Sequence, residues 1–327
     1  MPNTPMRAIA SACKAAKNIP SFFVASHYLS KIHRRDEKFI LCPYGIGDTL
    51  YVASLVAAYK THHDIPSVKL IVKKGQEDIP DFFDAVDGKV VSNRMVRRLR
   101  AFDHRARVFE EGNYLHGHFV LDFAWPEPGR MLGVKGLSFI DIYKRLVLKL
   151  PMDAKLQLPK IMIPKARMDE LTEAYGNKKT LLLMPYTVTV GESDRRIWES
   201  ISERYLEKGY RLLTNVLPGQ EAIQGSAGIT LSIKETYVLA NTLRWECIAQ
   251  RSGLCDLFGF SDVKMTVVHG NPNSGAAWNM AGLGLPNPNM RDAILSGAGN
   301  ISRDVAVILR KHERQVRKAS GEERSRV

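Results

Sequence analysis

The sequence predicts an α/β protein with two doubly wound domains that face one another across a cleft. Short apolar, β-branched runs alternate with helical patterns along most of the chain, which is typical of βαβ units and parallel sheets. A stretch rich in proline interrupts this alternation near the middle. The chain has 327 residues, of which 45% are hydrophobic. That is enough for two ordinary cores, because single domains usually contain about 100–200 residues.

The first domain is predicted over residues 38–150, after a basic helical extension at residues 1–37. Its strand candidates are short runs of apolar and β-branched residues, a composition that suits a pleated, buried surface. They are residues 39–41, 68–72, 89–91 and 118–123. Apolar residues recur with helical spacing after the first of these runs, and residues 140–150 form a further predicted helix.

Prolines interrupt the alternation over residues 151–165, which we predict to be an extended linker. The second domain is predicted over residues 166–300 and again alternates helices with short strands. The predicted helices are residues 166–175, 197–208 and 235–245, and the predicted strands are residues 180–184, 210–214, 229–231 and 264–268. A C-terminal helix and basic tail follow over residues 301–327, with the helix itself predicted at 303–318.

A glycine turn in the first domain holds the most informative residues. Gly45, Gly47, Asp48 and Thr49 follow the apolar run 39–43 and precede a helix. Strand, glycine turn and helix together present backbone N–H groups and a helix N-terminus to an anionic ligand. Asp48 would repel a phosphate there, so the sequence favours a role as catalytic base that accepts a proton from a substrate hydroxyl. The alternative is a tight turn that Asp48 caps.

Cofactor and metal sites are not indicated by the sequence. The turn lacks the third glycine of a dinucleotide-binding loop, and no acidic residue follows the second predicted strand. The four cysteines do not have the paired spacing of a metal site, so reduced thiols are expected. No apolar run approaches ~18 residues and no signal-peptide pattern is recognisable, which predicts a cytoplasmic protein.

Two clusters in the second domain suit a phosphorylated ligand. The connection 185–196 carries Thr187, Arg195 and Arg196, and hydroxyls with paired guanidinium groups at a helix start suit a diphosphate. The alternative is that both arginines are solvated, and Trp198 beyond them is interpreted as a core residue.

The second cluster, Arg251, Ser252, Gly253 and Asp256, lies within six residues and suggests contacts to phosphate and ribose. Ser252 could instead serve only as the cap of the helix that follows.

The net charge of +13 indicates an anionic partner. Nucleic acid, anionic lipid headgroups and a phosphorylated substrate would all be attracted. Because no zinc finger or aromatic RNA-binding pattern is present, docking at the inner membrane surface as a peripheral protein is favoured over nucleic-acid binding. A generally solvated basic surface is the alternative.

Three short stretches resemble the bacterial heptosyltransferase family that builds the lipopolysaccharide core. Residues 45–55 resemble the family's opening loop and helix, in which a Gly-Asp pair places the proposed catalytic base. Residues 196–198 resemble its Lys-x-Trp, whose cation meets the donor diphosphate, with arginine here in place of lysine. Residues 251–256 resemble its Asp-Ser-Gly-x-x-His, which holds the nucleotide-sugar donor; Arg251 stands in place of the aspartate and Asp256 in place of the histidine.

The resemblance implies a glycosyltransferase with two Rossmann-like domains, the GT-B architecture. It implies transfer of a sugar from a nucleotide-diphosphate sugar to a saccharide or lipid-linked acceptor, in the synthesis of lipopolysaccharide or capsule. Asp48 would then be the base, and the second-domain clusters would bind the donor. No Asp-x-Asp pair suggests a metal, so cationic side chains and a helix N-terminus would stabilise the leaving diphosphate.

Two other function classes stay open at this point. One is a catalytically silent protein of the same architecture that binds a nucleotide sugar. The other is a basic nucleic-acid-binding protein.

Overall fold

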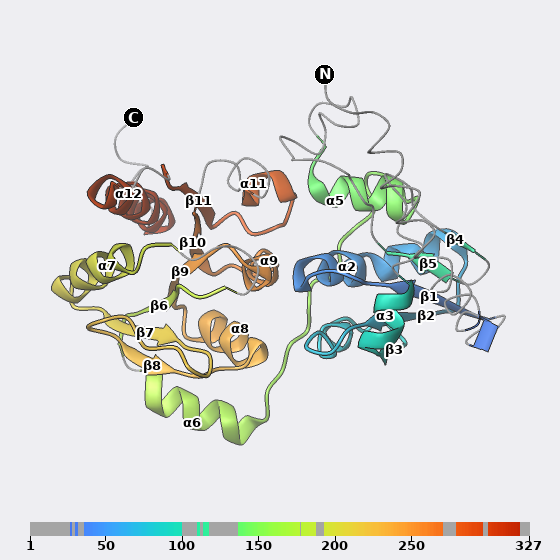
Figure 1. Ribbon diagram of the computed structural model, residues 1–327, viewed down its shortest axis with the longest axis horizontal. Coiled ribbons are helices and arrows are strands. Elements are labelled where there is room, and N and C mark those ends of the chain that lie inside the picture. Colours follow the sequence, from blue (N-terminus) through green and yellow to red (C-terminus); the bar gives the residue numbers. More distant parts are fainter. Residues whose placement is uncertain are drawn as a thin grey trace, which may run out of the picture. The chain divides into compact units, whose positions relative to one another are not determined.

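The computed structural model describes residues 36–99, 110–111, 114–117, 137–176, 178–187, 193–270, 279–296 and 300–320, together with residues 27, 30 and 31. These residues belong to two compact units (Figure 1). The described part of the first unit contains residues between 27 and 117 and residues 141–160; that of the second contains residues 137–140 and residues from 161 to 320. The division after residue 160 falls within the segment predicted as a linker.

The first unit is built on a sheet with strand order β3-β2-β1-β5-β4. The strands are β1 (Glu37–Leu41), β2 (Ser67–Val72), β3 (Gly88–Val91), β4 (Glu110–Glu111) and β5 (Tyr114–His116). All neighbours pair in parallel except β4, which is antiparallel to β5. The chain moves outward from β1 to β3 and then returns to the other side of β1, so the strand order reverses beside β1. In doubly wound sheets ligands bind at the carboxyl ends of strands at such a reversal.

Helix α2 (Ile46–His63) follows β1 and is apolar around most of its circumference, which is typical of a buried helix. The first unit also contains η1 (Pro80–Phe82) and α3 (Asn93–Leu99). Helix α5 (Phe139–Ile142) carries the chain back from the second unit and continues as a π-helical segment, η3 (Tyr143–Val147). The prediction of a single helix over residues 140–150 is therefore wrong in detail. The last turn widens to π geometry and ends before Lys149, which has a positive φ of 51°.

The second unit contains a fully parallel sheet with strand order β11-β10-β9-β6-β7-β8. Its strands are β6 (Thr180–Met184), β7 (Arg211–Asn215), β8 (Ala227–Ile229), β9 (Glu246–Gln250), β10 (Lys264–His269) and β11 (Met290–Ile294). Its helices are α6 (Lys165–Tyr175), α7 (Arg195–Glu207), α8 (Ile233–Thr242), α9 (Gly253–Phe258), α11 (Met280–Leu283) and α12 (Ile301–Ser320). The predicted fold class, α/β with doubly wound sheets, is confirmed.

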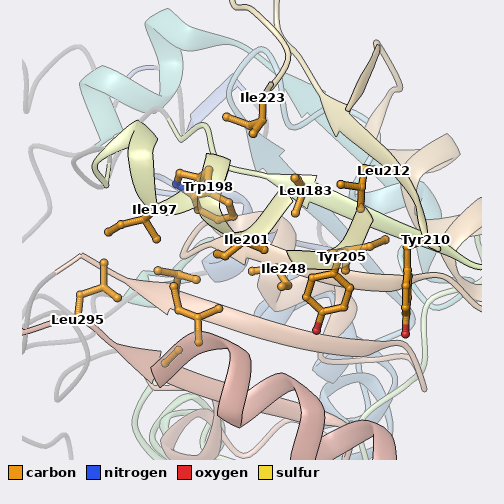
Figure 2. Packing of buried hydrophobic residues seen from close by; sticks show 14 residues of the cluster. Leu183, Ile197, Trp198, Ile201, Tyr205, Tyr210, Leu212, Ile223, Ile248 and Leu295 are labelled. Atoms are coloured by element: carbon orange, nitrogen blue, oxygen red, sulfur yellow. The ribbon is translucent and has the colours of Figure 1, made fainter. Parts of the chain in front are cut away.

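The core between the second sheet, α7 and α12 shows why these residues form these elements (Figure 2). Leu183 and Ile248 lie on neighbouring strands and face Ile201 of α7, while Ile308 of α12 joins the same cluster. Trp198 is only 1% exposed, which confirms its interpretation as a core residue. Each such side chain stabilises the fold by about 1.5–3 kcal/mol on burial.

Two strands of the second sheet were not predicted. The predicted helix at residues 235–245 ends at Thr242, and β9 begins at Glu246 after a turn at Arg244, where φ is 50°. The polar residues at both ends of β9 conceal it in the sequence, and β11 has an arginine and an aspartate in its centre.

The strand predicted at residues 118–123 and most of the N-terminal extension lie outside the described residues. None of the helices in the described ranges is long and apolar enough to cross a bilayer.

Glu246 begins β9 inside the second unit and is only 5% exposed. Its carboxylate lies 3.2 Å from Nε2 of His312 on α12 and accepts a hydrogen bond of 3.1 Å from Tyr210. His312 also lies 2.9 Å from Thr266 through Nδ1, so the network joins α12 to two strands. Burial alone would raise the pKa of Glu246, but the bonds from His312 and Tyr210 and the charges of His312 and Lys179 outweigh it and lower the pKa.

Because the pKa of Glu246 is lower in the folded protein, its ionised form stabilises the fold above the ordinary pKa of about 4.3–4.5. This contribution is lost as the pH falls from there through the folded pKa. We predict that Glu246→Gln lowers the free energy of unfolding by about 1–3 kcal/mol at pH 7, and that the difference shrinks below about pH 4. Urea unfolding between pH 3 and pH 7 measures it. The control is Glu313→Gln on α12, which removes the partly exposed partner of Lys208. This substitution should change the free energy of unfolding by less than about 1 kcal/mol. A pH-independent difference for Glu246→Gln would contradict the prediction.

Candidate functional site

Asp48 occupies the first turn of α2, directly after the turn that leaves β1. Its Oδ2 accepts a hydrogen bond of 2.9 Å from the Gly45 N–H, so the carboxylate reaches back to the residue that precedes the helix. A Cβ at Gly45 would lie 3.3 Å from that same oxygen, so a larger residue would displace the carboxylate by a few tenths of an ångström. Gly47 is buried in this turn. Asp48 therefore does act in capping, as the alternative interpretation stated, but only one of its two oxygens is used for this.

The turn is also anchored from a distant part of the chain. Thr49 donates through Oγ1 to the Gly45 carbonyl at 3.2 Å and to Oε1 of Gln76 at 3.3 Å. Gln76, buried in the connection after β2, donates through Nε2 to the Tyr44 carbonyl at 2.8 Å. Gln76 was not predicted as a site residue, because no local sequence pattern joins it to the glycine turn. The result is a turn whose backbone is fixed on both sides.

The second oxygen of Asp48 accepts a hydrogen bond of 2.8 Å from the Tyr143 hydroxyl. Tyr143 is fully buried at the start of the π-helical segment, and its ring lies 5.5 Å from that of Tyr51 on α2. Burial, and then the charge of Asp48, raise the pKa of Tyr143 well above its ordinary value, so the phenol stays a hydrogen-bond donor. Asp48 itself is half-buried. A carboxylate has about four lone-pair positions, so Asp48 can still accept a hydrogen bond from a substrate hydroxyl.

In the second unit the two predicted clusters follow β6 and β9, which are neighbours in the sheet. The strand order reverses between these two strands, and both strands end at the same edge of the sheet. The Ser193 hydroxyl accepts a hydrogen bond of 2.7 Å from Nε1 of Trp198 and donates one of 2.8 Å to Oε1 of Gln250. The structure therefore joins the two connections. Gln250 was missed as a site residue because β9 was not predicted; Thr187 is half-buried in the connection after β6.

Arg195 and Arg196 lie exposed at the start of α7. Arg196 forms a 2.6 Å ion pair with Asp194, which also accepts the Arg196 N–H and so caps the helix. The hydrogen bonds from Arg196 lower the pKa of Asp194. Arg195 pairs with Glu199 at 3.0 Å and donates to the Ala222 carbonyl at 2.9 Å. Each guanidinium thus has an acidic partner, and because both side chains are exposed each can exchange that partner for a phosphate at modest cost.

Arg251 and Asp256 form a buried bidentate ion pair. Their exposed fractions are 6% and 3%, and the two N–O distances are 2.8 and 3.1 Å. Arg251 also donates to the Ser252 carbonyl and so holds the backbone at the start of α9. The two departures from the Asp-Ser-Gly-x-x-His pattern are therefore partners of one another. A guanidinium at the first position and a carboxylate at the last form a neutral pair inside the protein.

Ser252 and Gly253 lie between Arg251 and Asp256 in the sequence. Ser252 occupies the residue before α9, yet its hydroxyl makes no capping hydrogen bond and lies 3.7 Å from the Cys255 sulfur. The alternative prediction that the Ser252 side chain caps the helix is therefore wrong. Gly253 is the first residue of α9. Cys255 is fully buried, and burial raises the pKa of its thiol, which makes it a poor nucleophile.

The residues that the structure describes contain no group of three or more His, Cys, Asp or Glu side chains placed to hold a metal ion. Metal independence nevertheless stays a prediction, and so do the individual donor-binding roles.

The chain is similar to known proteins in structure and not in sequence. No family model matches the sequence, and no curated protein matches it. The solved structure of E. coli ADP-heptose lipopolysaccharide heptosyltransferase II is similar, with a TM-score of 0.55 and 10% identity over 86% of this chain and 99% of that one. A glycosyl transferase family 9 protein from Veillonella parvula has a TM-score of 0.57 and 10% identity over 88% of this chain and 97% of its own. The chain has the fold of these glycosyltransferases, which confirms the resemblance at the level of fold.

The buried pair generates a prediction about stability. Asp256→Leu leaves the Arg251 charge buried without a partner and should lower the free energy of unfolding by about 3–5 kcal/mol. The double variant Arg251→Met/Asp256→Leu should recover most of that loss, because no uncompensated charge remains. Urea unfolding of the two single variants and the double variant measures the coupling.

The matched control is the exposed pair Arg204 and Glu207, 3.1 Å apart on α7, where the same substitutions should show coupling below about 1 kcal/mol. Purely additive effects at positions 251 and 256 would show that the two side chains do not pair in solution.

Proposed function

We propose that this protein is a glycosyltransferase that moves a sugar from a nucleotide-diphosphate sugar to a hydroxyl of a saccharide or lipid-linked acceptor, in the synthesis of a cell-surface polysaccharide such as lipopolysaccharide. The observation that carries this proposal is in the second unit. Two connections rich in hydroxyl and guanidinium groups leave neighbouring strands where the strand order reverses, and the bond between Ser193 and Gln250 joins them. That is the position at which doubly wound sheets bind nucleotides.

In this proposal the donor lies at the carboxyl edge of the second sheet. Arg196 and Arg195 exchange their exposed carboxylate partners for the diphosphate, and Thr187 adds a hydroxyl. The first N–H groups of α7 favour the developing negative charge of the leaving nucleotide. Arg251 and Asp256 have a different role, because their pair is closed and buried: they hold Ser252 and Gly253 in position for the donor. The E. coli structure is named for ADP-heptose, which supports an ADP-sugar as the first donor to test.

Asp48 in the first unit is the proposed catalytic base. Both of its oxygens are fixed by donors, and the carboxylate is only half-buried, so it can meet a substrate hydroxyl. No step needs a metal ion in this scheme, since cationic side chains and a helix N-terminus balance the charge of the diphosphate.

The basic character of the chain supports action on an anionic acceptor at the cytoplasmic face of the inner membrane. Helix α12 buries Ile308 and His312 and exposes Arg303, Arg310, Lys311 and Arg314. Such a row of charges is attracted to anionic headgroups at about 1 kcal/mol per residue near the surface. This placement as a peripheral protein is part of the proposal.

A second candidate function is a binding protein without transferase activity. The closed pair of Arg251 and Asp256 favours it, because neither side chain is available to a ligand without breaking a buried ion pair. Binding of nucleic acid rests on net charge alone.

The first experiment is a thermal-shift screen of the purified protein against nucleotide diphosphates and nucleotide sugars. A ligand at ~100 times its dissociation constant adds about 2.7 kcal/mol of stability, which is readily seen. A selective response identifies the donor, and release of its nucleotide on addition of saccharide acceptors then tests transfer. Binding without transfer to any acceptor would favour the silent protein. A response only to oligonucleotides, lost with added salt, would overturn the proposal.

Removal of the proposed base gives a sharper prediction. Asp48→Asn keeps the hydrogen bond from Gly45 but cannot accept a proton, so turnover should fall by about 10²–10⁴-fold while donor affinity stays the same. Steady-state kinetics and calorimetric titration of the donor measure the two quantities. Asp64→Asn at the other end of α2, where the aspartate is exposed in a left-handed conformation, is the control and should match the unsubstituted protein. Unchanged turnover in Asp48→Asn would remove Asp48 from the mechanism.

A further inference from the structure

We propose that Tyr143 is a positioning residue for Asp48, a role that rests on the proposed function and goes beyond it. Its hydroxyl holds the carboxylate in the one orientation in which a remaining lone pair can take the proton of the acceptor hydroxyl. Tyr143 lies 95 residues beyond Asp48 in the sequence, and the two side chains meet at 2.8 Å.

The two oxygens of Asp48 accept hydrogen bonds from different donors. Oδ2 is bound by the Gly45 N–H, which belongs to a turn fixed by Thr49 and Gln76. With that bond alone the carboxylate could still rotate about its last side-chain torsion, which is broad for aspartate. The Tyr143 hydroxyl on Oδ1 removes that freedom. A base whose lone pairs point in fixed directions does not have to be oriented at the moment of proton transfer.

Tyr143 is itself held rigidly. It is fully buried, and its ring packs against Tyr51, which lies on α2 one turn beyond Asp48. Its backbone carbonyl accepts the Leu148 N–H at 2.9 Å, the bond that closes the π-helical turn. Turns of this kind are rare within helices and occur frequently at functional sites. The phenol is thus supported by packing on one side and by the backbone on the other.

The electrostatics of the pair agree with a donor role. Tyr143 stays protonated because burial and Asp48 raise its pKa. Two further titratable groups face the pair, Tyr51 from α2 and Cys42 from the end of β1, and burial followed by the Asp48 charge raises the pKa of the Cys42 thiol. The Cys42 thiol therefore stays neutral beside the carboxylate, and the Tyr143 phenol keeps the proton that it donates to Oδ1 of Asp48.

The test is Tyr143→Phe, which keeps the ring and removes only the hydroxyl. We expect kcat to fall about tenfold with little change in the KM of the donor, which separates loss of orientation from loss of binding. In the Asp48→Asn background the same substitution should cause no further loss, since the two residues act as one unit. Tyr205→Phe in the second unit is the control; its hydroxyl is buried and has no hydrogen-bond partner among the described residues, so kcat and KM should not change.

The outcomes separate this proposal from the proposed function. An active enzyme in which Tyr143→Phe has the kcat of the unsubstituted protein overturns the role of Tyr143 and leaves the function intact. An unsubstituted protein that transfers no sugar overturns the function. The role of Tyr143 is then decided by carboxyl-carbon NMR at neutral pH, in which Tyr143→Phe should change the chemical shift of the Asp48 signal because the hydrogen bond is lost, and an unchanged chemical shift contradicts the pairing.

If Tyr143→Phe fails to fold by circular dichroism, a fluorinated tyrosine at position 143 replaces it. Its more acidic hydroxyl donates a stronger hydrogen bond, so the carboxyl-carbon signal of Asp48 should move away from its position in the unsubstituted protein, and an unmoved signal would overturn the proposal.

Discussion

Two neighbouring strands of the second unit, β6 and β9, have connections that run in opposite directions across the sheet, and the candidate donor site depends on this reversal. From β6 the chain continues outward through β7 and β8, whereas from β9 it continues outward through β10 and β11. The strands are parallel, so both connections leave from the same edge. That arrangement brings residues 193 and 250 within hydrogen-bond distance although 57 positions separate them. Without it the two clusters would be unrelated surface features.

Three charged groups of the candidate site, Arg196, Arg251 and Asp48, each have a hydrogen-bonded partner, and the depth of burial decides what that partner does. Exposed pairs such as Arg196 with Asp194 contribute little to stability and can be exchanged for a ligand. The buried pair of Arg251 and Asp256 cannot be opened without a large desolvation cost, so it belongs to the framework. Asp48 lies between these cases, since it is half-buried and bound by uncharged donors.

The sequence predicted those strands whose residues are apolar because the strands are buried. Strands β1, β2, β6 and β10 are apolar runs because parallel strands are covered on both faces. Strand β9 was not predicted because its first residue is a glutamate. This glutamate is tolerated inside the protein because His312 and Tyr210 bind it. The same distinction holds in the site. Asp48 and Arg251 were found from local spacing, whereas Tyr143 and Gln76 depend on tertiary contacts that no local pattern reports.

The buried pair at positions 251 and 256 has a consequence for how such a protein is recognised. A chain that changes either position alone passes through a state with an unpaired charge inside the protein, so the two positions are constrained to change together. In this chain the start of α9 is held by the ion pair, although two of the four residues that define the Asp-Ser-Gly-x-x-His signature, those at its two ends, are different. A search for the exact sequence pattern then misses this segment, although the ion pair that holds the start of α9 is present. Such an exchange preserves the charge balance between positions 251 and 256. That balance is recognised only when the two positions are considered together.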